Sequence, residues 1–222
     1  MTAVSDEEGH IKRLLNDRVE FKLFSAEQHL NRLREIENAY GDIAKYSARI
    51  EVEMEADCFV SQLIGAVRSL LLQINDQLDL GIPISQINFA NVQSALSAKT
   101  KKIDLLSPLD EARQQGNWFH RLNELENQLV HRTFLKKVIH IHDFPPKPVQ
   151  VRFLDVQREP GSENPFDPVM DMEVIRYLEK SLQQVRELIF SIRSSEPLLQ
   201  QHQNQQQQAL VTQWDEPNSN NT

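Results

Sequence analysis

Apolar residues recur at helical spacing along most of the chain. The periodicity from residue 11 to residue 40 predicts a helix that ends at Gly41. Between residues 43 and 80 the apolar positions return every three or four residues, which predicts one long amphipathic helix that ends before Gly81. Its predicted buried stripe comprises Val52, Ala56, Phe59, Leu63, Val67, Leu70, Ile74 and Leu78.

The rest of the chain predicts three further helices. A weaker pattern covers residues 85–106. A helix over residues 107–134 is indicated by Ser107, which suits the capping position, and by Pro108, which suits the first helical position because its missing N–H would be unpaired there anyway. Residues 175–192 carry apolar side chains at spacings of three and four, as a packing helix does. About five helices without an internal repeat predict an all-α fold, an antiparallel helical bundle.

One stretch, near residues 138–166, departs from helical periodicity. Residues 138–142 are short and β-branched, the prolines within residues 145–148 forbid a helix, and a weakly alternating segment follows them. We therefore expect a small hairpin or an irregular insertion there. The last segment, 196–222, is rich in Gln and Asn and is expected to be disordered, which leaves residues 1–195 as a single helical domain.

Composition and charge narrow the class of protein. The 222 residues include 24 Lys and Arg against 32 Asp and Glu, a formal net charge of −8, and only 6 Gly. The one cysteine, Cys58, cannot form an intramolecular disulfide or a thiolate zinc cluster, and it has no neighbouring cation to activate it. The start of the chain is acidic, unlike a signal peptide, and no apolar stretch approaches the ~20 residues of a membrane span. We expect a cytoplasmic protein that does not enter a membrane.

The basic residues and histidines are concentrated in the middle of the chain. Residues 99–152 carry 10 basic and 6 acidic side chains, together with four of the 7 histidines, whereas the flanking segments are acidic. His140 and His142 have the spacing of a metal-binding pair on an extended segment, but no third ligand accompanies them, so no metal site is predicted. The chain has no glycine-rich phosphate loop, and no cofactor is expected.

The most informative segment is the predicted helix around residues 118–132. Its apolar stripe would comprise Trp118, Leu122, Leu125 and Leu129. At 100° per residue, Asn123, Asn127 and His131 point away from that stripe. Two carboxamides and an imidazole in one row can donate and accept hydrogen bonds toward a single ligand. The alternative interpretation is the solvated polar face of a surface helix.

Two blocks of the sequence resemble the HEPN superfamily. Residues 127–132, Asn-Gln-Leu-Val-His-Arg, resemble its Arg-Asn-x-x-x-His motif. Residues 55–70, which begin Glu-Ala-Asp-Cys-Phe-Val, resemble the earlier long helix of bacterial HEPN-like proteins, and a tryptophan ahead of the motif, here Trp118, also recurs in them. The matches come in the expected order. The resemblance implies a helical bundle and a homodimer in which two motif helices meet across a twofold axis.

The resemblance also implies a mechanism, from which the chain departs at one position. In members with ribonuclease activity, which need no metal, the histidine transfers protons and the arginine stabilises the extra negative charge on phosphorus. Asn127 and His131 match the motif and are the candidate catalytic residues. Glu126 occupies the arginine position, where a carboxylate would repel phosphate. Neither Arg121 nor Arg132 has the i±3 or i±4 spacing that would pair with Glu126 along the helix.

We therefore expect a HEPN-like protein without ribonuclease catalysis that acts by binding RNA or a protein partner. Asn123 and Arg132 are the candidate binding residues. Stress response, toxin–antitoxin systems and phage defence are the contexts that the resemblance implies. Two alternatives stay open. One is a metal-independent endoribonuclease with an atypical site, and the other is a structural assembly subunit that uses the apolar stripe of residues 175–192.

Overall fold

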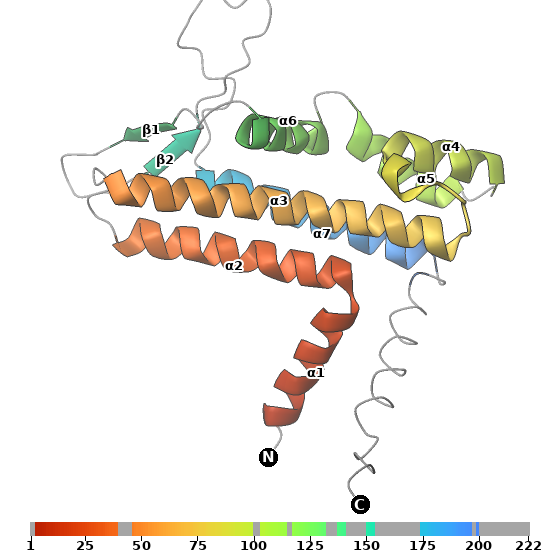
Figure 1. The fold of residues 1–222 in the computed structure, drawn as a ribbon, viewed down its shortest axis with the longest axis horizontal. Coiled ribbons are helices and arrows are strands. Elements are labelled where there is room, and N and C mark those ends of the chain that lie inside the picture. Colours follow the sequence, from red (N-terminus) through yellow and green to blue (C-terminus); the bar gives the residue numbers. More distant parts are fainter. Residues whose placement is uncertain are drawn as a thin grey trace, which may run out of the picture. The chain divides into compact units, whose positions relative to one another are not determined.

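The computed structural model is built from helices (Figure 1). It describes residues 3–39, 46–99, 103–114, 117–131, 137–140, 150–153, 174–196 and 199. In these ranges the elements are α1 (Ala3–Asn16), α2 (Arg18–Ala39), α3 (Tyr46–Gln77), the 3₁₀-helix η1 (Ile84–Gln86), α4 (Phe89–Lys99), α5 (Ile103–Arg113), α6 (Trp118–His131), β1 (Lys137–His140), β2 (Gln150–Phe153) and α7 (Val174–Ser195). The predicted all-α class is confirmed. The described residues form seven α-helices rather than about five, because two of the predicted helices are divided.

The chain divides into two compact units, each assembled from separate segments. Unit 1 comprises residues 1–24, 65–117 and 185–222, and unit 2 comprises residues 25–64 and 118–184. The helices α2, α3 and α7 contribute residues to both units. The single domain expected over residues 1–195 stays a prediction.

The long helix α3 supplies core residues to both units. Its existence was predicted over residues 43–80, and every member of the predicted stripe from Val52 to Ile74 is buried. Leu78 is half-buried in the turn that follows. Asn75 closes that turn, since its Oδ1 accepts a hydrogen bond from the Ile82 backbone N–H at 2.9 Å. Gly81 adopts a φ of 75°, which a residue without a Cβ enters at little cost.

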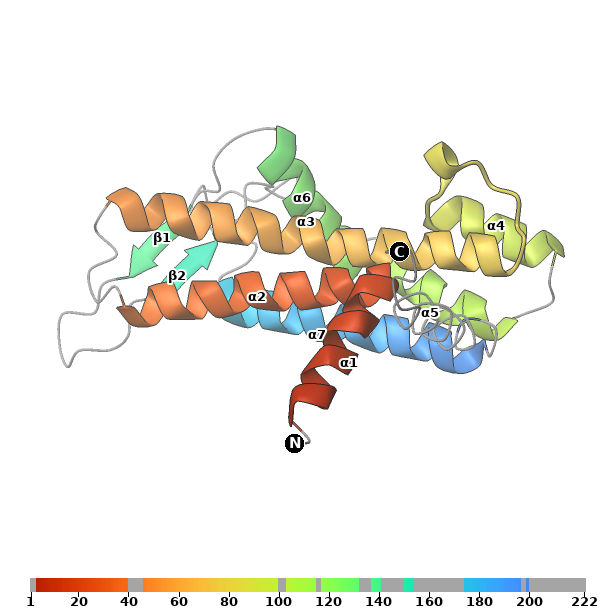
Figure 2. The same ribbon diagram turned by 60° about the horizontal axis from the view of Figure 1, so that its bottom comes forward.

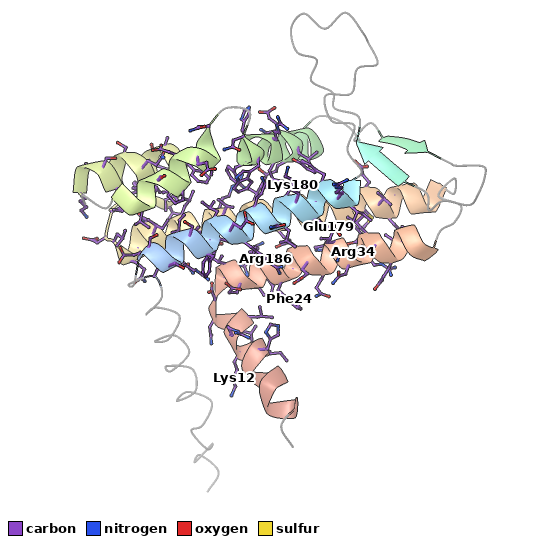
Figure 3. All side chains as sticks on the ribbon, turned by 180° about the vertical axis from the view of Figure 1, so that it is seen from behind. Lys12, Phe24, Arg34, Glu179, Lys180 and Arg186 are labelled. Atoms are coloured by element: carbon purple, nitrogen blue, oxygen red, sulfur yellow. The ribbon has the colours of Figure 1, made fainter. Side chains whose placement is uncertain are left out.

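In unit 2, segments of α2, α3 and α7 lie side by side (Figures 1 and 2). His29 Nδ1 on α2 lies 2.7 Å from Glu55 Oε2 on α3. Arg34 on α2 donates to Glu179 Oε1 on α7, with 2.6 Å between Nη2 and the oxygen, and Figure 3 labels both residues. The apolar side chains beneath these contacts repeat at helical spacing on each segment, as the core of a bundle requires. They include Ala26, Leu30, Leu33, Ile36, Val52, Ala56, Phe59, Leu63, Leu178 and Leu182.

The helix predicted over residues 11–40 is wrong in one respect, because it is interrupted at Asp17. α1 ends at Asn16 and α2 begins at Arg18. The Asp17 carboxylate accepts hydrogen bonds from the backbone N–H groups of Val19 and Glu20, at 3.0 and 3.3 Å. It therefore caps α2, which supplies partners to N–H groups that have none within the helix.

The helix predicted over residues 107–134 is also wrong, because two helices occupy that range. α5 ends at Arg113 and α6 begins at Trp118. Pro108 lies inside α5 rather than at its first position. The buried side chains of Leu105, Leu109 and Ala112 explain this start, since their spacing of four and three makes one continuous apolar stripe across the proline. Burial of that stripe outweighs the backbone hydrogen bond that proline cannot make.

The hairpin expected near residues 138–166 is confirmed as a small antiparallel ladder. β1 pairs with β2 in a register that sets Lys137 opposite Phe153 and His140 opposite Gln150. The residues between the strands lie outside the described part of the chain. This ladder is the only β-structure in the described ranges, so the fold remains helical in class.

One segment of α3, Ile50–Gln77, is long and apolar enough by length and composition to cross a membrane. Half of its most apolar stretch is buried in the fold. The central helix of a soluble bundle passes the same test, because it is surrounded by other helices and carries apolar residues on most of its faces. The expectation that the protein does not enter a membrane stays a prediction.

The packed part of unit 1 extends past the end of α7. Glu196 and Leu199 are only 3 % and 2 % exposed, and the Leu199 backbone N–H donates to the Glu196 carbonyl at 3.0 Å. These residues belong to the segment 196–222, which was expected to be disordered. The segment therefore has a packed beginning, and residues 200–222 lie outside the described part of the chain.

Candidate functional site

The helix α6 buries one face and turns the opposite face outward. Leu122 and Leu125, the central members of the predicted stripe, are 0 % and 5 % exposed, and Phe119, which was not predicted to belong to it, is 6 % exposed. Trp118 is half-buried instead of buried, and its ring meets that of Phe119 edge to face with 5.5 Å between centroids. Phe119 thus occupies the core position that the sequence pattern assigned to Trp118. The side chain of Leu129 lies outside the described residues.

The predicted polar row is carried by the outer side of α6. Asn127 is exposed, and Asn123, one turn earlier, is half-buried. The Asn123 carboxamide donates to the Phe119 carbonyl at 3.0 Å, so one of its two N–H groups is engaged within the helix. His131 is the last residue of α6, one turn beyond Asn127, and its side chain is not among those described. Arg132 lies outside the described residues.

Glu126, at the position where the HEPN motif has arginine, is half-buried on α6. It follows directly after the buried Leu125 and directly precedes the exposed Asn127, so it lies at the edge between the apolar and polar faces. A carboxylate at such an edge projects negative charge toward any ligand that contacts the polar row. The cation nearest to it on α6, Arg121, is exposed and lies five positions earlier, on a different side of the helix.

A second cluster of polar groups, in unit 1, was not predicted from the sequence. It consists of Asp17, Glu20, Gln73 and Arg193 and is called the Arg193 cluster below. Arg193 Nη2 donates to Asp17 Oδ2 at 2.9 Å and to Gln73 Oε1 at 3.0 Å, while Nη1 donates to Glu20 Oε1 at 2.8 Å. The side chains of Arg193 and Asp17 are 9 % and 5 % exposed.

The Arg193 cluster connects three helices rather than forming a reactive site. Arg193 comes from α7, Gln73 from α3, Glu20 from the first turn of α2, and Asp17 from the capping position just before α2. The guanidinium meets two carboxylates, which compensates the cost of burying its charge. Its Nε atom has no hydrogen-bond partner within the described residues. No single stretch of sequence indicated this cluster, because Arg193 and Asp17 are separated by 176 positions.

Among the described residues, the remaining reactive side chains do not form a second candidate site. Burial raises the pKa of the Cys58 thiol, and the carboxylates of Asp57 and Glu55 raise it further, so the thiolate that a nucleophile needs is disfavoured. Within the described ranges, no three His, Cys, Asp or Glu side chains gather closely enough to hold a metal ion. His140 lies in β1 with its side chain outside those described, and His142 lies outside the described residues, so the histidine pair is not placed.

Comparisons with known proteins found no matching family model, no similar curated protein and no similar solved structure.

Proposed function

We propose that the chain is a HEPN-like protein that acts by binding RNA or a protein partner and does not catalyse RNA cleavage. The proposal is supported by the position of Glu126 on α6, beside the exposed Asn127 and one turn or more before His131. A metal-independent ribonuclease of this kind needs a cation where the phosphate gains charge in the transition state. The chain has a carboxylate there.

The size of the repulsion between the Glu126 carboxylate and a bound phosphate supports the proposal. At a separation of about 6 Å and an effective dielectric constant of about 20, two like unit charges repel by about 3 kcal/mol. Each 1.4 kcal/mol changes a rate or an equilibrium constant about tenfold. The attraction between an arginine and the phosphate is also lost. Glu126 therefore disfavours both the binding of a phosphate and the transition state of RNA cleavage.

The assembly-subunit alternative loses the surface on which it depended. The apolar stripe of α7 is buried in the fold, with Leu178, Val185 and Ile192 each fully buried. A face that is already covered by the protein's own chain is not available to a partner without unfolding. Among the described side chains of α7, the large exposed apolar one is instead Phe190, which lies outside that stripe and is 74 % exposed.

Cleavage assays on the purified full-length chain test the proposal. The wild-type protein and the His131→Ala variant should show the same background cleavage of a mixed RNA pool, with and without a chelator. Glu126→Arg should increase RNA binding or produce trace cleavage, because it restores the positive charge. Glu124→Arg is the matched control, since Glu124 is also half-buried on α6 and the variant makes the same change in net charge. Wild-type cleavage that His131→Ala abolishes would contradict the proposal.

The binding role needs a separate measurement. Tagged protein isolated from its own host should retain RNA or a specific protein after salt washing, and Asn127→Ala should reduce that retention without lowering the melting temperature. Asn127 is suitable because it is exposed and makes no contribution to the buried face of α6. If nothing is retained by the wild-type protein, the binding role is wrong even where cleavage is absent.

A further inference from the structure

The first half of α3 carries a row of apolar side chains that the rest of the chain leaves exposed. Ile50 and Met54 are 49 % and 61 % exposed, and Cys58, one turn further on, is also exposed. At about 100° per residue, Ile50 and Cys58 lie about 40° to either side of Met54, so the three side chains form one row, called the Met54 stripe below. The buried Val52 and Ala56 lie about 160° away from Met54, on the opposite face of the helix.

Carboxylates flank the Met54 stripe on both sides. By the same rotation, Asp57 and Glu53 lie about 60° and 100° from Met54 on one side. Glu51 and Glu55 lie at about the same two angles on the other side. All four carboxylate side chains are half-buried, so they lie low against the helix beside the exposed apolar row. The surface is therefore apolar along its centre and acidic along both edges.

Cations from α2, which lies alongside α3 (Figure 2), offset only part of this charge. His29 Nδ1 lies 2.7 Å from Glu55 Oε2. Arg32 Nη1 donates to Glu35 Oε2 at 2.9 Å, and this hydrogen bond raises the pKa of Arg32. The charges of Glu51 and Glu55 raise it further, so both lie close enough to attract the guanidinium. One guanidinium and one imidazole thus meet three carboxylates, and negative charge exceeds positive charge among the described side chains of this flank.

The thiol of Cys58 reports the negative field on the stripe itself. Burial raises the pKa of Cys58, and the charges of Asp57 and Glu55, one on each flank, raise it further. A second copy of the same surface would bring carboxylates against carboxylates, and the phosphates of RNA would be repelled in the same way. The surface instead suits apolar side chains that have Lys or Arg on either side.

We propose that the Met54 stripe is a docking surface for a basic amphipathic helix of a partner protein. The apolar side chains of that helix would cover Met54, and its Lys and Arg side chains would meet the flanking carboxylates. The stripe rises by about 12 Å from Ile50 to Cys58, which is about two turns of a helix. It lies on α3 within unit 2, apart from the polar row of α6, and does not depend on the HEPN resemblance or on whether RNA is cleaved.

Binding of a synthetic helix to the full-length chain tests the surface. The probe is a fluorescent peptide of about 15 residues with Leu in one row and Lys on both sides of it, compared by anisotropy with a scrambled peptide of the same composition. Only the amphipathic peptide should bind tightly, and added salt should weaken its binding. Met54→Ser should weaken binding about tenfold, whereas Ile84→Ser, at a 79 % exposed position in η1, should not change it.

Charge reversal separates a local site from the effect of net charge. Asp57→Lys should weaken binding of the amphipathic peptide about tenfold. Asp76→Lys is the matched control, since Asp76 is exposed in the last part of α3 and the variant makes the same change in net charge. Circular dichroism verifies that all variants are folded. Equal effects of Asp57→Lys and Asp76→Lys, or binding that survives Met54→Ser, would overturn the proposal.

Cys58 is the one cysteine of the chain and provides a direct test of position. In a glutathione redox buffer, a peptide with a cysteine in its apolar row should form a disulfide with Cys58, whereas a peptide with the cysteine among its lysines should not. Equal cross-linking of both peptides would contradict the proposed orientation. A wild-type chain that sediments as a dimer and is separated by Met54→Asp would assign the stripe to a second copy instead of a partner helix.

Discussion

At Asp17 one carboxylate separates two helices, caps the second and neutralises a buried cation. Its Oδ1 accepts hydrogen bonds from the backbone N–H groups of Val19 and Glu20, and both of its oxygens accept from Arg193 Nη2. Gln73 Nε2 also donates to Oδ1, at 3.3 Å. A carboxylate with this many donors is tightly held. The interruption between α1 and α2 is therefore fixed by tertiary contacts as well as by the local cap.

Removing the Asp17 side chain should destabilise the fold strongly. Asp17→Ala leaves the buried Arg193 without its buried counter-charge, since the remaining partner Glu20 is 36 % exposed. The change should lower the free energy of unfolding by about 3–5 kcal/mol, measured by urea denaturation. Arg34→Ala is the matched control, because the Arg34–Glu179 pair is about 42 % exposed and should contribute about 0–1 kcal/mol.

Asp17→Asn separates the two roles of that carboxylate. Asparagine caps a helix about as well as aspartate, so this variant keeps the cap at Oδ1. It loses the charge and replaces Oδ2, which accepts from Arg193, by an amide group that can only donate. Its loss of stability should lie between those of Asp17→Ala and the wild type. Equal stability of Asp17→Ala and Arg34→Ala would show that the Arg193 cluster contributes no more than a surface ion pair.

At the scale of helices, the sequence pattern predicted the buried apolar positions of a helix more accurately than the residues at which the helix begins and ends. The stripe of α3 was predicted almost residue by residue, since a long buried helix repeats the same spacing many times. The ends of α1 and α5 were missed for opposite reasons. The interruption at Asp17 leaves the apolar periodicity intact, and Pro108 indicates a helix start that the buried stripe of α5 overrides.

The two faces of α6 should differ in their contribution to stability. Leu125→Ala should lower the free energy of unfolding by about 2–5 kcal/mol, because Leu125 is 5 % exposed and its truncation opens a cavity. Asn127→Ala, two residues later on the exposed face, should change it by less than about 0.5 kcal/mol. Urea denaturation of both variants measures the difference. Equal losses would mean that the exposed and buried faces of α6 are wrongly assigned.

At the scale of the whole molecule, the helical class followed from composition and periodicity, whereas the long-range contacts did not. The class depends on local patterns that repeat along the chain. The contacts of Arg193 depend on which distant segments meet, and neither charge nor spacing in one sequence specifies that. The same limit applies to the candidate site. The pattern correctly placed Asn127 outward and Leu125 inward, but it assigned to Trp118 the core position that Phe119 occupies.

The boundary between the packed chain and the segment after it follows from burial, and truncation can locate it. Deleting residues 201–222 keeps Leu199 and should change the melting temperature little, since it removes no described buried side chain. Deleting residues 197–222 also removes Leu199, which is 2 % exposed, and should cost about 2–4 kcal/mol. At about 2–4 °C per kcal/mol, scanning calorimetry should record a fall in the melting temperature of several degrees.

Leu199→Ala in the full-length chain should reproduce most of that fall. If both truncations melt together with the wild type, Leu199 does not belong to the cooperative core, and the folded part ends at α7.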